Sequence, residues 1–356
     1  MHDFTNKELF KIASEKEDWE LFVFLAKELD EDDQKDENGW SPLHYYATAP
    51  QRVIRRRRIF QRDISKGAVT EFLSIFTDKN PRDKKDVTPL HILAKNGCNL
   101  DLFNLVMDVV DDKSPVDEYG FTPLHYAAEN GHLEQVQSIA ALVNSILLES
   151  TKPVQYKEWP IALSKMTPLH LAAMNGHFPI LKHLVNFLKD DINPPQGEGL
   201  TALHLAAFYG HFEIVSFYTK QLDEVNPIGN GYWNCRTPLH LAACGGHLDV
   251  VKHFCDKLQD KNPCDETGMT PLHEAAKKGH LEVVRHLLRY VDDKEPKCKD
   301  YPLKDATPLD LAKDYRHSEV ISLLEGPWWD FCHPLHPSAV RTPESHQKNY
   351  ENKPEN

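Results

Sequence analysis

Histidine is the most abundant side chain here that could perform acid–base chemistry or bind a metal, with 20 copies among 356 residues. A neutral imidazole exchanges protons near neutral pH and ligates transition metals. Most of these histidines, however, recur at fixed positions of a repeated pattern, which indicates a structural role rather than a catalytic centre. Seven end a Thr-Pro-Leu-His tetrapeptide or a close variant of it, and six follow a Gly or replace a Gly-His pair. The two groups are His44, His91, His125, His170, His204, His240 and His273, and then His132, His177, His211, His247, His280 and His317.

Outside the repeated pattern, Cys332, His333 and His336 form one cluster with several possible metal ligands. Their spacing matches no structural zinc site in which a fourth ligand is visible. The sequence also lacks a Gly-x-Ser-x-Gly nucleophile turn, a Gly-x-x-x-x-Gly-Lys phosphate loop and a His-Glu-x-x-His zinc motif. We therefore expect no metal, no cofactor and no catalytic residues, and a protein that is not an enzyme.

The tetrapeptide itself predicts how each repeated unit folds. Its Thr can cap the amino end of a helix, and its Pro suits the first helical position, where no amide hydrogen is needed. In a typical unit, Gly176 can end this helix in the left-handed conformation, and residues 178–188 read as a second amphipathic helix. Each unit is therefore expected to be helix, turn, helix and hairpin loop. The copies begin at Ser41, Thr88, Thr122, Thr167, Thr201, Thr237 and Thr270, with a degraded copy at Thr307.

A tetrapeptide of this kind at intervals close to 33 residues resembles the ankyrin-repeat family, and the resemblance covers residues 5–326. A single unit cannot bury its apolar face, so neighbouring units must stack into a solenoid. The fold class expected is all-α. The resemblance implies an elongated, curved stack of helix pairs, in which the inner helices and the hairpin fingers line a concave surface that grips other proteins.

The predicted domain organisation is one array of about nine units over residues 1–326. Residues 1–36 are expected to form an amino-terminal capping unit, residues 37–301 seven core units, and residues 302–326 a carboxyl-terminal capping unit. The tail, residues 327–356, is polar and contains Pro, so we expect it to be disordered.

Two units are longer than the period, with inserts near residues 48–66 and 149–166. The first insert holds the one dense basic cluster of the chain, Arg55, Arg56, Arg57 and Arg58. Such a cluster is typical of a nuclear-import signal or a site for an anionic partner. The alternative is a solvated loop or helix extension that pairs with neighbouring acids, and the sequence leaves both interpretations open.

Residues that bind a partner should lie at positions that face the predicted concave surface. Residues directly after the Ala-Ala pair of an inner helix should face that side, and the residue before each motif Thr or Ser should stay partly exposed on a finger. Long fingers add further aromatic residues, which are frequent anchors of protein interfaces. They could equally pack on the next finger. The predicted residues are Met174, Phe208, Tyr209, Trp233, Tyr232, Trp159, Trp40 and Phe121.

Composition limits the partners and the compartment. A net charge of −13 favours protein partners with basic segments and disfavours direct nucleic-acid binding. No apolar run approaches the ~18 residues of a membrane span, and the amino terminus lacks the apolar core of a signal peptide. The seven cysteines include no Cys-x-x-Cys pair, which suits reduced thiols. We expect a monomer in the cytoplasm, and also in the nucleus if the arginine insert is an import signal.

Two functions are consistent with these features. The first is an intracellular scaffold or adaptor that binds proteins through its concave face. The second is a stoichiometric inhibitor resembling the inhibitors of nuclear factor kappa-B, in which an acidic ankyrin stack masks a basic segment of a transcription factor. A fragment homologous to the cytoplasmic domain of an ankyrin-bearing channel is disfavoured, because no membrane segment is visible.

Two asparagines are candidates for modification. Asn193 and Asn226 follow an aliphatic residue in the turn after an outer helix, whereas Asn80 and Asn262 follow Lys at the same position. The resemblance implies that asparagines in the first context can be substrates of an asparaginyl hydroxylase. The alternative is that all four hold the turn by hydrogen bonding to nearby backbone.

Overall fold

A computed structural model gives the fold of the chain. The residues that it describes are 9, 12–13, 19–28, 35–48, 70, 73–97, 100–143, 148–155, 163–188, 191–229, 235–291, 293–299 and 304–326. The arginine insert, Trp159, Tyr232, Trp233 and the tail lie outside these residues. Within the described residues the chain forms sixteen helices and no strand, with two isolated β-bridges in the fingers. The predicted all-α solenoid is therefore confirmed.

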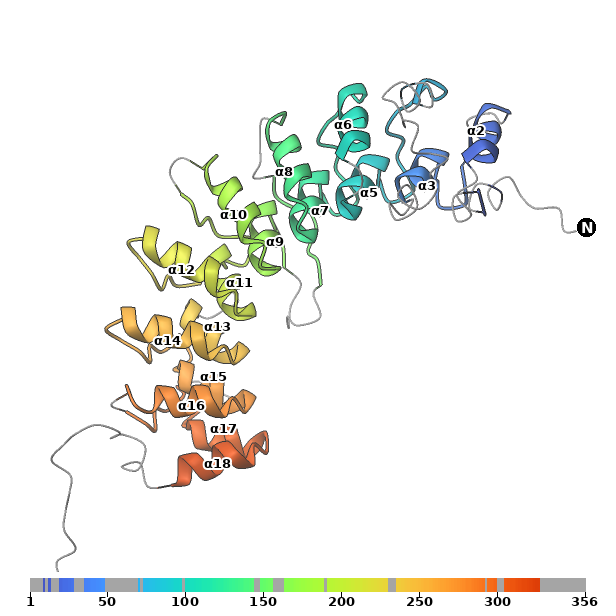
Figure 1. The fold of residues 1–356 in the computed structure, drawn as a ribbon. Helices are drawn as coiled ribbons and strands as arrows, with labels where there is room; N and C mark the ends of the chain where they lie inside the picture. Colours follow the sequence, from blue (N-terminus) through green and yellow to red (C-terminus); the bar gives the residue numbers. More distant parts are fainter. Residues whose placement is uncertain are drawn as a thin grey trace, which may run out of the picture.

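The helices stack in two rows along a curved array, with the inner row on its concave side (Figure 1). The inner helices are α3 (Pro42–Thr48), α5 (Pro89–Asn96), α7 (Pro123–Asn130), α9 (Pro168–Met174), α11 (Ala202–Tyr209), α13 (Pro238–Gly245), α15 (Pro271–Lys278) and α17 (Pro308–Asp314). The outer helices are α2 (Trp19–Glu28), α6 (Leu100–Val109), α8 (Leu133–Ala140), α10 (Phe178–Val185), α12 (Phe212–Gln221), α14 (Leu248–Lys257), α16 (Leu281–Leu287) and α18 (Ser318–Glu325).

The inner helices begin and end as the motif predicts. In α7 the extended Thr122 is the N-cap, Pro123 follows it, and Gly131 ends the helix with φ of 83°. Two features of the structure favour glycine at position 131. A β-carbon at Gly131 would be strained by the positive φ, and it would lie 2.7 Å from the imidazole of His177 in the next unit. The helix end is thus shaped to receive the neighbouring unit.

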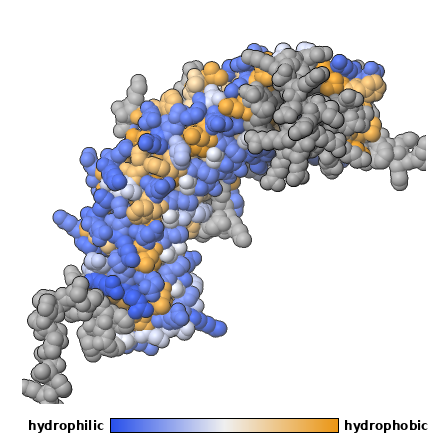
Figure 2. Space-filling model, viewed as in Figure 1, coloured by the Kyte–Doolittle hydropathy of each residue, from blue (hydrophilic) through white to orange (hydrophobic). Residues whose placement is uncertain are grey.

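The core is continuous between the two helix rows from one end of the array to the other. Five inner helices, α7, α9, α11, α13 and α15, carry an Ala-Ala pair, such as Ala172 and Ala173, that is fully buried and lets adjacent helices approach closely. Branched and aromatic side chains of the outer helices, such as Ile214 and Tyr218, fill the other side. Figure 2 shows a largely hydrophilic outer surface with separate apolar patches on this face. Stability therefore comes from contacts between neighbours, as expected for a solenoid.

The tip of each of these fingers has one residue in the left-handed backbone conformation, and this residue is not always glycine. Gly39, Gly120, Gly199 and Gly268 occupy this position in four units, each with φ between 81° and 83°. Four other units place a residue with a side chain there, with φ between 52° and 64°. These residues are Asp86, Lys165, Cys235 and Asp305. The left-handed region costs a residue with a β-carbon roughly 1–2 kcal/mol.

We therefore predict that Lys165→Gly stabilises the protein by about 1 kcal/mol, after allowing for the greater freedom of glycine in the unfolded chain. The exposed ion pair of Lys165 with Glu149 that is lost contributes little. A denaturant midpoint measured by circular dichroism checks this. Gly199→Lys is the matched reverse change and should destabilise the protein. Equal midpoints for all three proteins would contradict the prediction.

Candidate functional site

The motif histidines connect each unit to the next. In the central unit, His170 Nδ1 lies 2.8 Å from Thr167 Oγ1, and His170 Nε2 lies 3.0 Å from the backbone oxygen of Pro194 in the next finger. A carbonyl oxygen can only accept, so Nε2 carries the hydrogen and Nδ1 accepts from the Thr hydroxyl. The neutral imidazole is then fully hydrogen-bonded. The same bridge links His44 to Val87, His91 to Phe121, His125 to Met166, His204 to Arg236, His240 to Met269 and His273 to Ala306.

Burial keeps these imidazoles neutral. It lowers the pKa to about 4 for five of them, because the protein interior solvates a charged ring poorly. The five are His91, His125, His170, His204 and His240. The unit that begins at Thr307 has Asp310 in this place. Its carboxylate accepts from the Thr307 hydroxyl and amide, and these bonds lower the pKa of Asp310.

The second group of histidines, which precede the outer helices, connects each unit to the inner helix of the preceding unit. His211 Nε2 donates to the backbone oxygen of Met174, at the end of the preceding inner helix, over 2.9 Å. The other five bonds run from His132 to Lys95, His177 to Glu129, His247 to Phe208, His280 to Cys244 and His317 to Lys277. The structural role predicted for these thirteen histidines is confirmed by their bonds.

The described residues contain no group of three or more His, Cys, Asp or Glu side chains that could hold a metal ion. The cluster at Cys332 lies outside them. Over the same part of the chain, no helix combines the length and the apolar character required to cross a membrane.

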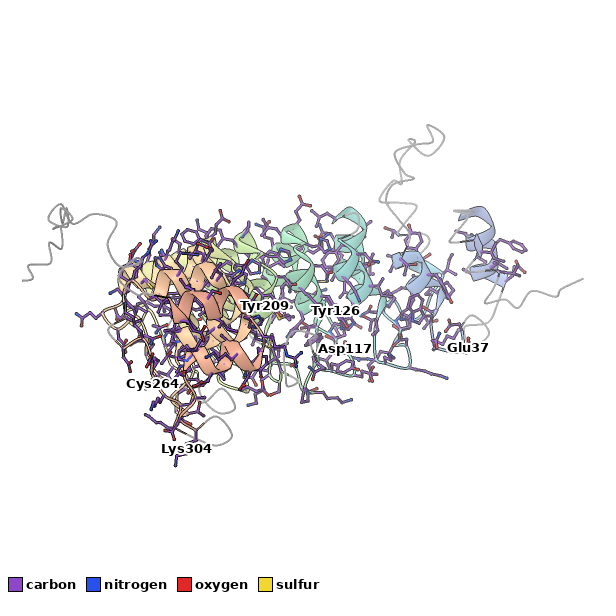
Figure 3. All side chains as sticks on the ribbon, turned by 90° about the horizontal axis from the view of Figure 1, so that it is seen from below. Glu37, Asp117, Tyr126, Tyr209, Cys264 and Lys304 are labelled. Atoms are coloured by element: carbon purple, nitrogen blue, oxygen red, sulfur yellow. The ribbon has the colours of Figure 1, made fainter. Side chains whose placement is uncertain are left out.

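The fingers are fixed by a buried carboxylate. Asp117 Oδ1 accepts from the backbone amides of Tyr119 and Phe121, and its Oδ2 accepts from the Tyr126 hydroxyl on α7 over 2.7 Å. Figure 3 labels Asp117 and Tyr126. Asp36, Asp83 and Asp265 make the same pair of amide contacts in their own fingers. Each of these fingers is thus a rigid support for the residue before the motif Ser or Thr.

The asparagines after the outer helices cap the inner helices. Asn193 Oδ1 accepts from the Leu203 amide over 3.1 Å, and Asn226 Oδ1 accepts from the Leu239 amide over 3.2 Å. Asn80 and Asn262 make the same contact to Leu90 and Leu272. Hydrogen bonding to backbone is therefore confirmed for all four asparagines. The donor in each case is a backbone amide in the first turn of the next inner helix.

A second apolar cluster lies between the inner helices and the fingers. It comprises Phe121, Leu163, Met166, Leu171, Met174, Leu200, Leu205 and Leu241, with Tyr126, Val154, Phe208 and Tyr209 packed against it. The expected partial exposure of Phe121 is wrong, because this side chain and that of Met174 are each only 5% exposed. The finger folds back over the inner helices, so the residue before the motif Thr fills the space between them.

Trp40 has a different environment in the first finger. It is half-buried, and its Nε1 donates to Asp83 Oδ2 of the next finger over 3.0 Å. Its ring also meets Tyr45 edge to face at 5.3 Å. Of the two arrangements expected for aromatic finger residues, Trp40 therefore adopts the one in which it packs on the next finger.

Phe208 and Tyr209 are the predicted residues that combine the apolar cluster with an accessible surface. They end α11, both are half-buried, and their rings meet edge to face at 5.1 Å. Tyr209, labelled in Figure 3, also stacks on His211 at 6.2 Å. The structure thus brings Phe121, Met174, Phe208 and Tyr209 together in one cluster and leaves Trp40 apart.

Sequence reasoning missed a buried ionic group beside this cluster. Arg236 takes the finger position that is apolar in most units, and Glu274 takes the place of Leu171, Leu205 and Leu241 in the motif. The Arg236 guanidinium lies 2.6 Å from Glu274 Oε1 and 3.4 Å from Asp265 Oδ2. Nearby, burial raises the pKa of the Cys244 thiol to about 12, with a further contribution from Glu274. The sequence did contain a signal for this ion pair, because Arg236 and Glu274 each depart from the apolar residue that the repeat has at their position.

A family model described as ankyrin repeats (3 copies) matches residues 62–145, 139–227, 218–300 and 239–326, which is more than half of the chain. The protein belongs to the ankyrin-repeat family. A search of curated proteins found no match. Ankyrin repeats indicate a protein–protein interaction domain.

Proposed function

We propose that this protein is a non-enzymatic scaffold or adaptor that binds partner proteins through the concave surface of its inner helices and fingers. The observation that carries the proposal is the pair Phe208 and Tyr209. Both rings are half-buried, on the inner-helix row and against the apolar cluster. Aromatic side chains with one accessible face are frequent anchors of protein interfaces.

The surroundings of the pair support such a role. Met174 and Leu205 beneath it are buried, and the His247 bond to the Phe208 backbone oxygen fixes the end of α11. Anchors that are already ordered lose little conformational entropy when a partner binds. The surface is therefore organised before the partner arrives.

We predict that the double change Phe208→Ala with Tyr209→Ala abolishes partner capture, because each anchor contributes about 2 kcal/mol or more. Affinity capture from cell lysate with mass spectrometry measures this, and circular dichroism checks the fold. The matched control is Phe187→Ala with Phe212→Ala, two exposed aromatic residues of the outer row, 46% and 41% exposed. Equal capture by wild type and by the Phe208 and Tyr209 variant would contradict this location of the groove.

The identity of the captured partner separates the two functions. The net charge of −13 supports a stoichiometric inhibitor that masks a basic segment of a transcription factor. A one-to-one complex with such a factor supports the inhibitor, and several different partners support the scaffold.

The free cysteines among the described residues suit the cytoplasm, where we place the protein as a monomer. Nuclear import through Arg55 to Arg58 stays a prediction.

Hydroxylation of Asn193 or Asn226 also stays a prediction, and it has a matched control in the chain. We expect peptide mass spectrometry of the protein from animal cells to show a gain of one oxygen at Asn193 or Asn226. Asn80 makes the same backbone contact but follows Lys, so it should remain unmodified. Complete absence of the gain at both sites, with the hydroxylase expressed, would contradict the prediction.

A further inference from the structure

Two adjacent lysines occupy the concave positions of the unit that lies two after the aromatic pair. Lys277 and Lys278 follow the Ala-Ala pair of α15, as Phe208 and Tyr209 follow that of α11. Lys278 is exposed, and the Lys277 ammonium lies 5.6 Å from the centre of the Tyr315 ring. Within the described part of the chain, neither lysine forms an ion pair. These two positive charges stand in a protein with a net charge of −13.

The nearest carboxylates in the repeat pattern form no ion pair with either lysine. Asp314, which takes the place of Lys277 in the next unit, is exposed and has no ion pair among the described residues. Glu274, on the same helix as the lysines, pairs with Arg236, and so does Asp265. Glu266 in the finger accepts from the Cys235 thiol over 2.8 Å. Among the described residues, the lysine pair is therefore without an ion pair and can interact with a carboxylate of a partner.

The unit between the two pairs has small residues at the same positions. Cys244 and Gly245 follow the Ala-Ala pair of α13. A β-carbon at Gly245 would lie 2.3 Å from the Phe208 backbone oxygen, so the close approach of these two helix ends requires glycine. No bulky side chain from these positions of α13 separates the aromatic pair from the lysine pair.

We propose that the surface from Phe208 to Lys278 binds an extended acidic segment of a partner protein that carries one large apolar side chain. This inference rests on the proposed function above. The apolar side chain packs on Phe208 and Tyr209, and carboxylates pair with the two ammonium groups. Packed helices lie about 10 Å apart, so the two sites are separated by about 20 Å. About six extended residues span that distance.

The test is selection of peptides from a phage-displayed library of random dodecapeptides on the immobilised full-length protein. We expect the selected peptides to carry Asp or Glu about six residues from Phe, Trp or Leu. This selection would run against the net negative charge of the protein. The variant Lys277→Ser with Lys278→Ser should lose the acidic enrichment. The matched control, Lys252→Ser with Lys257→Ser on the outer helix α14, should keep it, since both lysines are exposed on that row.

A selected acidic peptide, synthesised with a fluorescein label, should bind the Lys277 and Lys278 variant about tenfold more weakly than wild type, as expected for two accessible ion pairs. Selected peptides that are neutral or basic, an enrichment that survives in this variant, or no selected peptide at all would overturn the inference. If cellular partner capture depends on Phe208 and Tyr209 but the peptides lack acids, the proposed function stands and the acidic segment is wrong.

Discussion

Lowering the pH from 7 to 5.5 is expected to reduce the free energy of unfolding by about 5 kcal/mol. Five motif histidines have pKa values of about 4 in the folded protein, against 6.5 in the unfolded chain. Between these two pKa values the unfolded chain binds more protons than the folded protein. The contribution of the neutral histidines to the free energy of unfolding is therefore fully present above pH 6.5 and decreases as the pH falls. Each histidine contributes about 1 kcal/mol to the loss over this interval.

The size of this effect can decide whether the array stays folded. A typical domain has about 5–15 kcal/mol of stability in total, so the expected loss is a large part of it. Burial raises the pKa of Glu129, which acts in the opposite direction, but one carboxyl group does not offset five imidazoles. Urea denaturation followed by circular dichroism at pH 7 and pH 5.5 measures the difference.

A single substitution separates the motif histidines from other groups that titrate in this range. His170→Gln loses the bonds to Thr167 and Pro194, and the variant should be less stable than wild type at pH 7. Its additional loss between pH 7 and pH 5.5 should nevertheless be smaller than that of wild type by about 1 kcal/mol, because one titrating imidazole has been removed. An identical pH dependence in the two proteins would show that His170 is not held neutral.

The repeated units could be predicted from the sequence because each motif residue acts within its own unit. Thr122 caps a helix, Pro123 starts it and Gly131 ends it, and none of these roles requires knowledge of the neighbours. The role of the histidines could be predicted from their regular recurrence. Their exact acceptors, such as the Pro194 oxygen, depend on stacking and appear only in the structure.

The accessible surface was less predictable because it depends on how the fingers fold back. Phe121 and Met174 look like surface residues when a single unit is considered, but the neighbouring units bury them. The expectation of a partly exposed finger position failed for the same reason at Met166, Leu200 and Met269, all of them buried. The aromatic pair Phe208 and Tyr209 stays half-buried beside the small Cys244 and Gly245 of the next unit.

Arg236→Met is expected to destabilise the protein by about 3–5 kcal/mol, which is the largest effect we predict for a single substitution. Glu274 is 2% exposed, and the Arg236 guanidinium 2.6 Å away is its ion-pair partner. Removing the guanidinium leaves a buried carboxylate without its counter-charge. Asp265 is affected less, because its Oδ1 still accepts from the Thr267 and Met269 amides. Thermal unfolding followed by circular dichroism measures the loss.

The double change Arg236→Leu with Glu274→Leu should recover most of that stability. Leucine stands at both positions elsewhere in the array, as Leu200 before the motif and as Leu205 and Leu241 within it, and all three are buried in the second apolar cluster. Replacing a buried ion pair by packed apolar side chains is often neutral or stabilising, whereas removing one partner is costly. A double variant as unstable as Arg236→Met would mean that the cost arises from lost packing of the Arg236 side chain and not from the isolated carboxylate. A recovery would show that the charged group is not required for the stability of the fold at this step of the stack.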